Sequence, residues 1–243
     1  MLNAIGLPNV LALVWFAACW IAFTYYADST DRGRHTLLSA MRAKRELWMR
    51  RMIARENRMV DTSIMSTLMR SVSLFASTTI FILAGLLAIL GSVDKAKAIL
   101  HEIPFAVIST ATQWDTKILL LLVIFVYAFF KFAWALRQFN YAIVLLGTAP
   151  PMEEAGSREA NEYAKASADV ISLAVLSFNR GLRSYYFGLA ALSWFIHPLL
   201  FAVATLWVMA VLYRREFMSK TLSCLESVPM PADFDSTANK GNG

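Results

Sequence analysis

The feature that most constrains this chain is a run of twenty residues, 74–93 (LFASTTIFILAGLLAILGSV), that contains no charged side chain. A helix of about 20 mostly apolar residues is long enough to cross the hydrocarbon core of a bilayer. Three further apolar runs predict spans of the same kind: 10–27, 118–136 and 187–213. The chain is 58% hydrophobic and only 16% charged, which excludes an ordinary cytosolic enzyme, a secreted disulfide scaffold and a disordered chain.

Lysine and arginine are distributed unevenly between the expected loops. Segments 28–73 and 131–183 together hold sixteen of them, against seven elsewhere. Because cytoplasmic loops are enriched in Lys and Arg, we place both segments in the cytoplasm and both termini outside, as expected for a multi-pass protein of the bacterial inner (cytoplasmic) membrane. Arg214 and Arg215 directly follow the last expected span and would favour the cytoplasm, so the side of the C-terminus conflicts with its flanking charge.

The first large loop predicts a basic amphipathic helix over about 36–59, because this stretch lacks Gly and Pro and its apolar residues gather on about half of a helical wheel. Three placements of this helix are open. It lies on the inner leaflet, it packs on another cytoplasmic helix or a second subunit, or it only caps the bundle. The residues expected to mark its membrane-surface role are Arg45, Trp48, Arg51 and Arg55.

A second cytoplasmic helix is predicted over about 158–180. Its later part, Val170 to Phe178, is apolar all round but too short to span a membrane, so we expect it to be buried against the other cytoplasmic helix or a second copy of the chain. The predicted fold class is therefore all-α: an integral membrane bundle of four transmembrane helices plus two cytoplasmic helices. Residues 1–222 form one domain, and 223–243 form a disordered tail.

The sequence holds no phosphate-binding glycine loop, nucleophile elbow or zinc-binding helix motif, so we expect no enzyme activity, no cofactor and no metal. The sharpest polar feature is His197-Pro198, inside the fourth expected span. An ionisable residue in a span is a functional candidate. It acts in proton or ligand handling, or it is a neutral imidazole that bonds to a neighbouring helix.

A basic and polar collar is predicted at the inner membrane surface, where the third span ends and the fourth begins. It either anchors the helices at the headgroups or binds an anionic headgroup or soluble anion. Its members are Arg137, Gln138, Asn140, Arg180, Arg183 and Tyr185.

Several segments of the chain are similar to one known family. They include Arg45-Glu46-Leu47-Trp48 in the basic helix, and the stretches STLMRSVSLFAS (66–77), WALRQFNY (134–141) and NRGLRSYYF (179–187). Over about residues 5–220 the chain resembles the domain of unknown function 599 family of four-helix membrane proteins, which occurs in bacteria and plants. This resemblance implies the membrane architecture, and it implies no activity, cofactor or catalytic residue.

The function we predict from the sequence is non-enzymatic: association with itself or another membrane complex, or interaction with anionic lipid headgroups at the cytoplasmic face. Nucleic acid is not an expected partner, because the basic residues are tethered at a membrane and lack an aromatic stacking platform. The alternative is a small oligomeric transporter or channel, proton-linked through His197.

Overall fold

The computed structural model describes residues 6–29, 36–91 and 110–231, which are helical apart from short connections and contain no strand. The helices, with two 3₁₀ turns labelled η, are α2 (Leu7–Ser29), α3 (Leu37–Ile53), α4 (Met59–Leu90), α6 (Ala111–Gly147), η2 (Met152–Glu154), α7 (Arg158–Leu192), η3 (Ser193–Phe195), α8 (Pro198–Phe217) and α9 (Lys220–Ser227).

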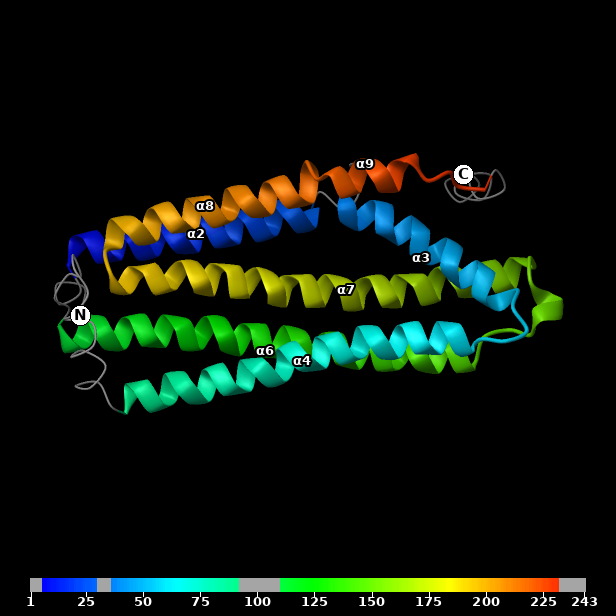
Figure 1. Ribbon diagram of the computed structural model, residues 1–243, viewed down its shortest axis with the longest axis horizontal. Coiled ribbons are helices and arrows are strands. Elements are labelled where there is room, and N and C mark those ends of the chain that lie inside the picture. Colours follow the sequence, from blue (N-terminus) through cyan, green and yellow to red (C-terminus); the bar gives the residue numbers. More distant parts are fainter. Residues whose placement is uncertain (1–5, 30–35, 92–109, 232–243) are drawn as a thin grey trace.

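Three helices, α4, α6 and α7, run the length of the molecule, while α2 with α3 and α8 with α9 form two rows of two helices each (Figure 1). We call the end where α7 turns into α8 the hairpin end, and the opposite end the α3 end. The hairpin half holds α2 and α8 beside the long helices, and the α3 half holds α3 and α9 (Figure 1). Each half has its own hydrophobic core: Phe16, Phe187 and Trp194 belong to the first, and Met49, Phe132 and Ala164 to the second.

Among the described helices, α6 and α7 make the most extensive contact. Small, buried residues recur along α7, and among them Ser177, Gly181 and Gly188 meet side chains of α6. These small residues include Ala164, Ala168, Ala174, Ser177, Gly181, Ser184, Gly188 and Ala191. Small residues let two helix backbones approach closely, which favours helix association where lipid supplies no hydrophobic drive. A Cβ atom built on Gly181 would overlap the Phe132 ring of α6, so only glycine fits at this crossing.

The fourth expected span is not one helix, which corrects the prediction for 187–213. Helix α7 ends at Leu192, η3 follows, and α8 begins at Pro198 and runs back towards the α3 end (Figure 1). Proline disfavours the helical conformation in the residue before it, and His197 is extended, with φ −155° and ψ 139°. The same proline is suited to the first turn of a new helix. Residues 158–180 are accordingly the first part of a longer helix that continues to Leu192.

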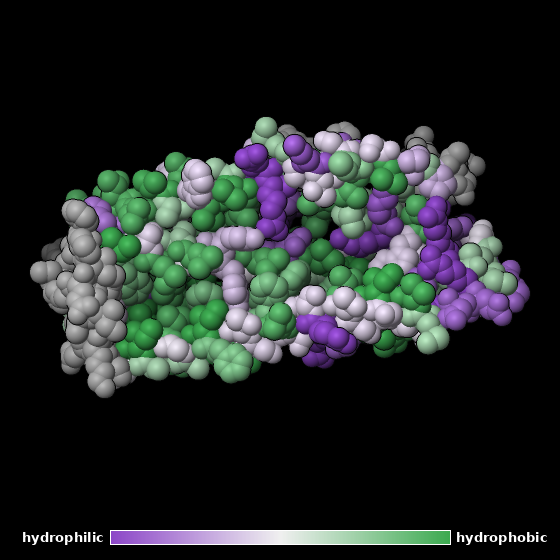
Figure 2. All heavy atoms as spheres, viewed as in Figure 1, coloured by the Kyte–Doolittle hydropathy of each residue, from purple (hydrophilic) through white to green (hydrophobic). Residues whose placement is uncertain are grey.

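Four stretches are long and apolar enough to cross a membrane: Leu7–Asp28, Met59–Leu90, Ala111–Gly147 and Pro198–Ser227. The four apolar helices are thus confirmed, with the fourth displaced towards the C-terminus. Apolar side chains cover the hairpin half, and hydrophilic ones gather from the middle of the molecule to the α3 end (Figure 2). Helix α6 has 37 residues, or about 55 Å at 1.5 Å per residue, far more than the ~30 Å hydrocarbon core.

Helix α3 packs on α7, one of the alternatives that the sequence left open. The expected helix over 36–59 is shorter, since α3 ends at Ile53 and α4 begins at Met59. Met49, Met52 and Ile53 are buried in the core of the α3 half, and the apolar stretch Val170–Phe178 of α7 contributes to the same core. Both segments that seemed to need a partner therefore find one within the chain.

The C-terminal segment lies at the α3 end, so the prediction that it lies opposite the large basic loops is wrong. Helix α9 contacts α3, and Nζ of Lys44 donates a hydrogen bond of 2.8 Å to the Val228 carbonyl. Residues 223–227 belong to α9 rather than to a disordered tail. Residues 228–231 follow α9 without helical structure, and residues 232–243 of the predicted tail lie outside the described residues.

The α6–α7 crossing gives a first prediction. Gly181→Ala should lower the free energy of unfolding by about 1–3 kcal/mol, because its methyl group overpacks a core that Phe132 already fills. The measurement is the midpoint of thermal unfolding in mild detergent. Gly85→Ala is the matched control, since a Cβ on Gly85 meets nothing within 4 Å. If Phe132→Leu fails to restore the stability of Gly181→Ala, the overpacking explanation is wrong.

Candidate functional site

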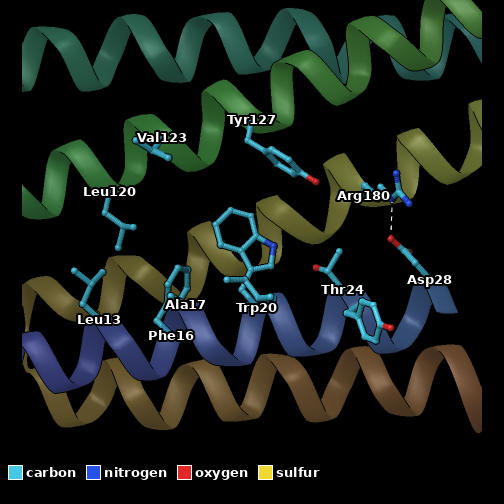
Figure 3. A pocket seen from close by; sticks show the side chains of 12 residues that line it. Leu13, Phe16, Ala17, Trp20, Thr24, Asp28, Leu120, Val123, Tyr127 and Arg180 are labelled. Atoms are coloured by element: carbon cyan, nitrogen blue, oxygen red, sulfur yellow. Dashed lines mark hydrogen bonds and ion pairs between the residues drawn. The ribbon is translucent and has the colours of Figure 1, made fainter. Parts of the chain in front are cut away.

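A groove runs between α2 and α6, with α7 as its back wall (Figure 3). It has a volume of about 910 Å³, within the range of about 300–1,000 Å³ that is typical of small-molecule sites. The lining residues are Leu13, Phe16, Ala17, Trp20, Ile21, Thr24, Tyr25 and Asp28 from α2, Leu120, Val123 and Tyr127 from α6, and Arg180 from α7.

Large aromatic side chains hold α2 away from α6 and α7. Trp20 stacks on Phe187 of α7 with ring centroids 5.7 Å apart, and its edge meets the Tyr127 ring of α6 at 5.8 Å. The ring centroids of Phe16 and Phe187 are 5.8 Å apart. Such ring contacts keep backbones much further apart than the small residues of the α6–α7 crossing do, so the groove is a direct result of side-chain size.

The two ends of the groove differ in chemistry (Figure 3). Towards the hairpin end its walls are apolar, with Leu13 and Ala17 facing Leu120 and Val123. Trp20 stands across the middle. Beyond it the lining turns polar and charged, with Thr24, Tyr127, Asp28 and Arg180. The groove therefore has the polarity of an amphiphile, with an apolar length and one polar end.

The polar end is organised by Asp28, the penultimate residue of α2. Its two carboxylate oxygens accept hydrogen bonds of 2.9 Å, one from Nε of Arg180 and one from Nη1 of Arg183. The two arginines are three residues apart on α7 and so share a helix face. The Arg183 side chain is only 8% exposed, against 31% for Arg180, and the Phe23 ring lies 5.9 Å from its guanidinium carbon.

A third cation, Lys131, stands beside this cluster. Its Nζ lies 5.2 Å from the centroid of the Tyr127 ring, and its charge interacts with those of Arg180 and Asp28. Arg180, Arg183 and Lys131 with Asp28 therefore make a cluster of three cations and one carboxylate, with a net charge of +2, of which Arg180 and Asp28 line the groove itself. The polar end of the groove favours an anion.

The six residues of the predicted collar do not form one group. Arg180 and Arg183 share Asp28, whereas Gln138 is buried and accepts a 2.8 Å hydrogen bond from Ser177 through its Oε1. The other three point elsewhere: the Tyr185 hydroxyl is 2.8 Å from that of Thr79, Nε of Arg137 donates to the hydroxyl of Tyr141, and Asn140 is exposed.

His197 and Pro198 do not lie in the middle of a span, which corrects their predicted place. His197 is exposed at the hairpin end, where it caps α8 and its Nδ1 accepts a 3.1 Å hydrogen bond from the Leu199 N–H. Pro198 is the first residue of α8. The pair therefore forms the start of α8 at the hairpin end.

The four residues expected to mark a membrane-surface helix have different surroundings. Trp48 and Arg55 donate hydrogen bonds of 2.6 and 2.7 Å to the same Asp61 carboxylate oxygen, at the start of α4. Arg45 is buried and donates to Ser172 of α7 at 3.3 Å. Arg51 is exposed.

Some residues of the site were not predicted from the sequence. They are Asp28, Trp20 and Tyr127, which line the groove. The sequence feature that could have indicated the site is an aspartate directly after an apolar run. Lys117 near the start of α6 is also buried, with Nζ 5.9 Å from the Trp194 ring. Within the part of the chain that the structure describes, no three His, Cys, Asp or Glu side chains come close enough to hold a metal ion.

By length and composition, the four apolar helices are those of a multi-pass membrane protein. Residues 11–221 match the family described as "Protein of unknown function, DUF599", and the chain belongs to this family. Comparison with curated proteins and with solved structures gives no match.

The shared carboxylate predicts an unequal cost of substitution. Asp28→Asn should lower the free energy of unfolding by about 2–3 kcal/mol, somewhat below the ~3–5 kcal/mol for breaking a fully buried pair, because Arg183 loses its charged partner. Arg180→Gln should cost less than about 1 kcal/mol, since Arg180 is partly exposed. Thermal unfolding in mild detergent measures both. Equal losses would contradict the central role of Asp28.

Proposed function

We propose that this protein is a non-enzymatic membrane protein that binds an anionic lipid, or a lipid-like amphiphile, in the groove between α2 and α6. An acyl chain lies along the apolar walls from Trp20 towards Leu13, and the anionic head lies beside Arg180 and Lys131. The observation that carries this proposal is the change in the lining from apolar to polar and charged along one continuous groove, with Arg180 in the lining at its charged end.

Placement in a membrane is supported by the surface of the hairpin half. Large apolar side chains stand exposed there on every helix. They include Leu11, Phe81, Leu119, Phe130, Leu189 and Trp207, each at least 58% exposed. A soluble monomer rarely exposes contiguous apolar patches of more than a few hundred Å². In a bilayer the same surface contacts acyl chains at no cost.

The orientation we propose puts the α3 half in the cytoplasm. The basic residues of α3 lie in this half, and the last turn of α8 adds Arg214 and Arg215. We further propose five crossings, because the C-terminal part of α7 runs beside α6 and α8 through the hairpin half (Figure 1). Five crossings place the N-terminus outside and the C-terminus inside, in agreement with the positive-inside rule.

With this orientation the polar end of the groove lies at the cytoplasmic leaflet. Asp28 is the penultimate residue of α2, and α2 ends near the middle of the molecule (Figure 1), where hydrophilic side chains begin to gather on the surface (Figure 2). Anionic lipids give that leaflet its negative surface potential, and basic residues near it attract them. The charge of the polar end of the groove and its depth in the membrane therefore both favour an anionic lipid.

The other functions expected from the sequence gain no support from these contacts. Trp48 and the stretch Val170–Phe178 pack within the chain, so they give no reason of their own for a second subunit. His197 stands exposed at the hairpin end, away from the centre of the bundle. A proton-linked transporter through His197 and self-association both stay predictions.

Filling the groove tests the proposal. Ala17 and Ala18 are neighbouring exposed alanines of α2, but only Ala17 lines the groove. Ala17→Phe should reduce the anionic lipid that remains bound through purification by about fivefold or more, because a displaced methylene is worth about 0.8 kcal/mol. Native mass spectrometry in mild detergent, with extracted lipid quantified per chain, gives the measurement.

Ala18→Phe is the matched control and should retain lipid like the unaltered protein. Equal retention by all three proteins, or equal loss from both variants, would contradict binding in the groove.

The proposed topology gives a separate prediction for Cys224, which is exposed on α9. In intact cells a membrane-impermeant maleimide should leave Cys224 unlabelled, and it should label this residue after permeabilisation. Asp115→Cys in a Cys224→Ser background is the control, because Asp115 is exposed near the hairpin end and should be labelled from outside. Labelling of Cys224 in intact cells would instead favour four crossings.

A further inference from the structure

A second pocket lies between α2, α3, α7 and α8, at the level where α2 ends and α3 begins. Its volume is about 190 Å³, and it shares no lining residue with the groove. Phe23, Leu38, Val175, Leu182 and Leu212 are among its apolar walls.

Three arginines from three helices line this pocket: Arg45 of α3, Arg183 of α7 and Arg215 of α8. Each is held by a neighbouring side chain. Arg45 donates to Ser172, the Arg183 guanidinium lies over the Phe23 ring, and Nη1 of Arg215 donates a 2.8 Å hydrogen bond to the Tyr186 hydroxyl. The guanidinium groups are thus positioned before any ligand binds, which lowers the entropy lost on binding.

The charge of the pocket favours an anion. Glu216 is the acidic residue of the lining, and Asp28 accepts a hydrogen bond from Arg183 from outside it. Arg45 and Arg183 are only 8% and 7% exposed. Three arginines and one glutamate give the lining a net charge of +2, and Asp28 beside Arg183 lowers the charge of the whole cluster to +1.

We propose that this pocket binds a phosphate group. The planar guanidinium fork of arginine matches phosphate oxygens in paired hydrogen bonds, and Asn179 and Tyr186 add further polar groups to the lining. Two sources of this chemistry reach the pocket: a soluble phosphate or phosphate ester, or the headgroup of a lipid with an exposed phosphate. The inference does not depend on a ligand in the α2–α6 groove.

The test uses the full chain in nanodiscs of a zwitterionic lipid. Inorganic phosphate is titrated against chloride at constant ionic strength, and the midpoint of thermal unfolding is followed. A second set of nanodiscs contains phosphatidic acid in place of added phosphate. Arg215→Gln removes a lining arginine, while Arg214→Gln is the matched control, because Arg214 is exposed and does not line the pocket.

We expect phosphate, phosphatidic acid or both to raise the unfolding midpoint, and Arg215→Gln to weaken the effect about tenfold in ligand concentration, as expected for the loss of one charge-assisted hydrogen bond. Stabilisation by dissolved phosphate identifies a soluble ligand, and stabilisation by phosphatidic acid alone identifies a lipid headgroup. No stabilisation by either, or equal weakening by Arg214→Gln and Arg215→Gln, overturns the proposal. Ala17→Phe should leave phosphate binding unchanged, which separates this pocket from the groove.

Discussion

The close contact between α6 and α7 is the constraint on which the rest of the bundle depends. Glycine, alanine and serine along α7 let it approach α6 closely, and Gly181 against Phe132 marks the tightest point. With this face used for packing, α7 occupies the centre of the molecule. Its other faces meet α3 and α8 and carry the arginines that reach Asp28. The position of α2 follows from the opposite principle, because aromatic rings at Trp20 and Phe16 keep it away and leave a groove.

The sequence predicted α2, α4 and α6 because each contains a long apolar run, and such a run is typical of a helix long enough to cross a membrane. Helix α7 was harder to predict, because it is largely surrounded by protein and can be small and polar. Its last part was assigned to a span that in fact bends back at His197-Pro198. The end of the helix could have been predicted, because the residue before a proline disfavours the helical conformation. The apolar content of 187–213 obscured it, since a turn between two spans can be as apolar as a span.

The charged residues of the site were predicted by type but not by partner. Arg180 and Arg183 were expected to meet an anion, and the structure pairs both with Asp28, which lies about 150 residues earlier in the chain. Such a pairing depends on the rotation of each helix about its axis and on which helices are neighbours. Neither follows from spacing within one segment. The same limitation explains why Arg137 and Gln138, adjacent in sequence, point to different surroundings.

The two rows made of paired helices have a mechanical consequence. Helix α2 ends at Ser29 and α8 ends at Phe217, so both rows stop near the same level and continue as separate helices, while α4, α6 and α7 pass that level unbroken. Three continuous helices therefore pass this level, where α2 and α8 end and α3 and α9 begin (Figure 1). The pocket with Arg45, Arg183 and Arg215 lies at this level. Its walls come from α2 and α8, which end here, from α3, which begins here, and from α7, which passes through. A ligand bound there would contact α3 together with α2, α7 and α8, and so would hold α3 in place against these helices.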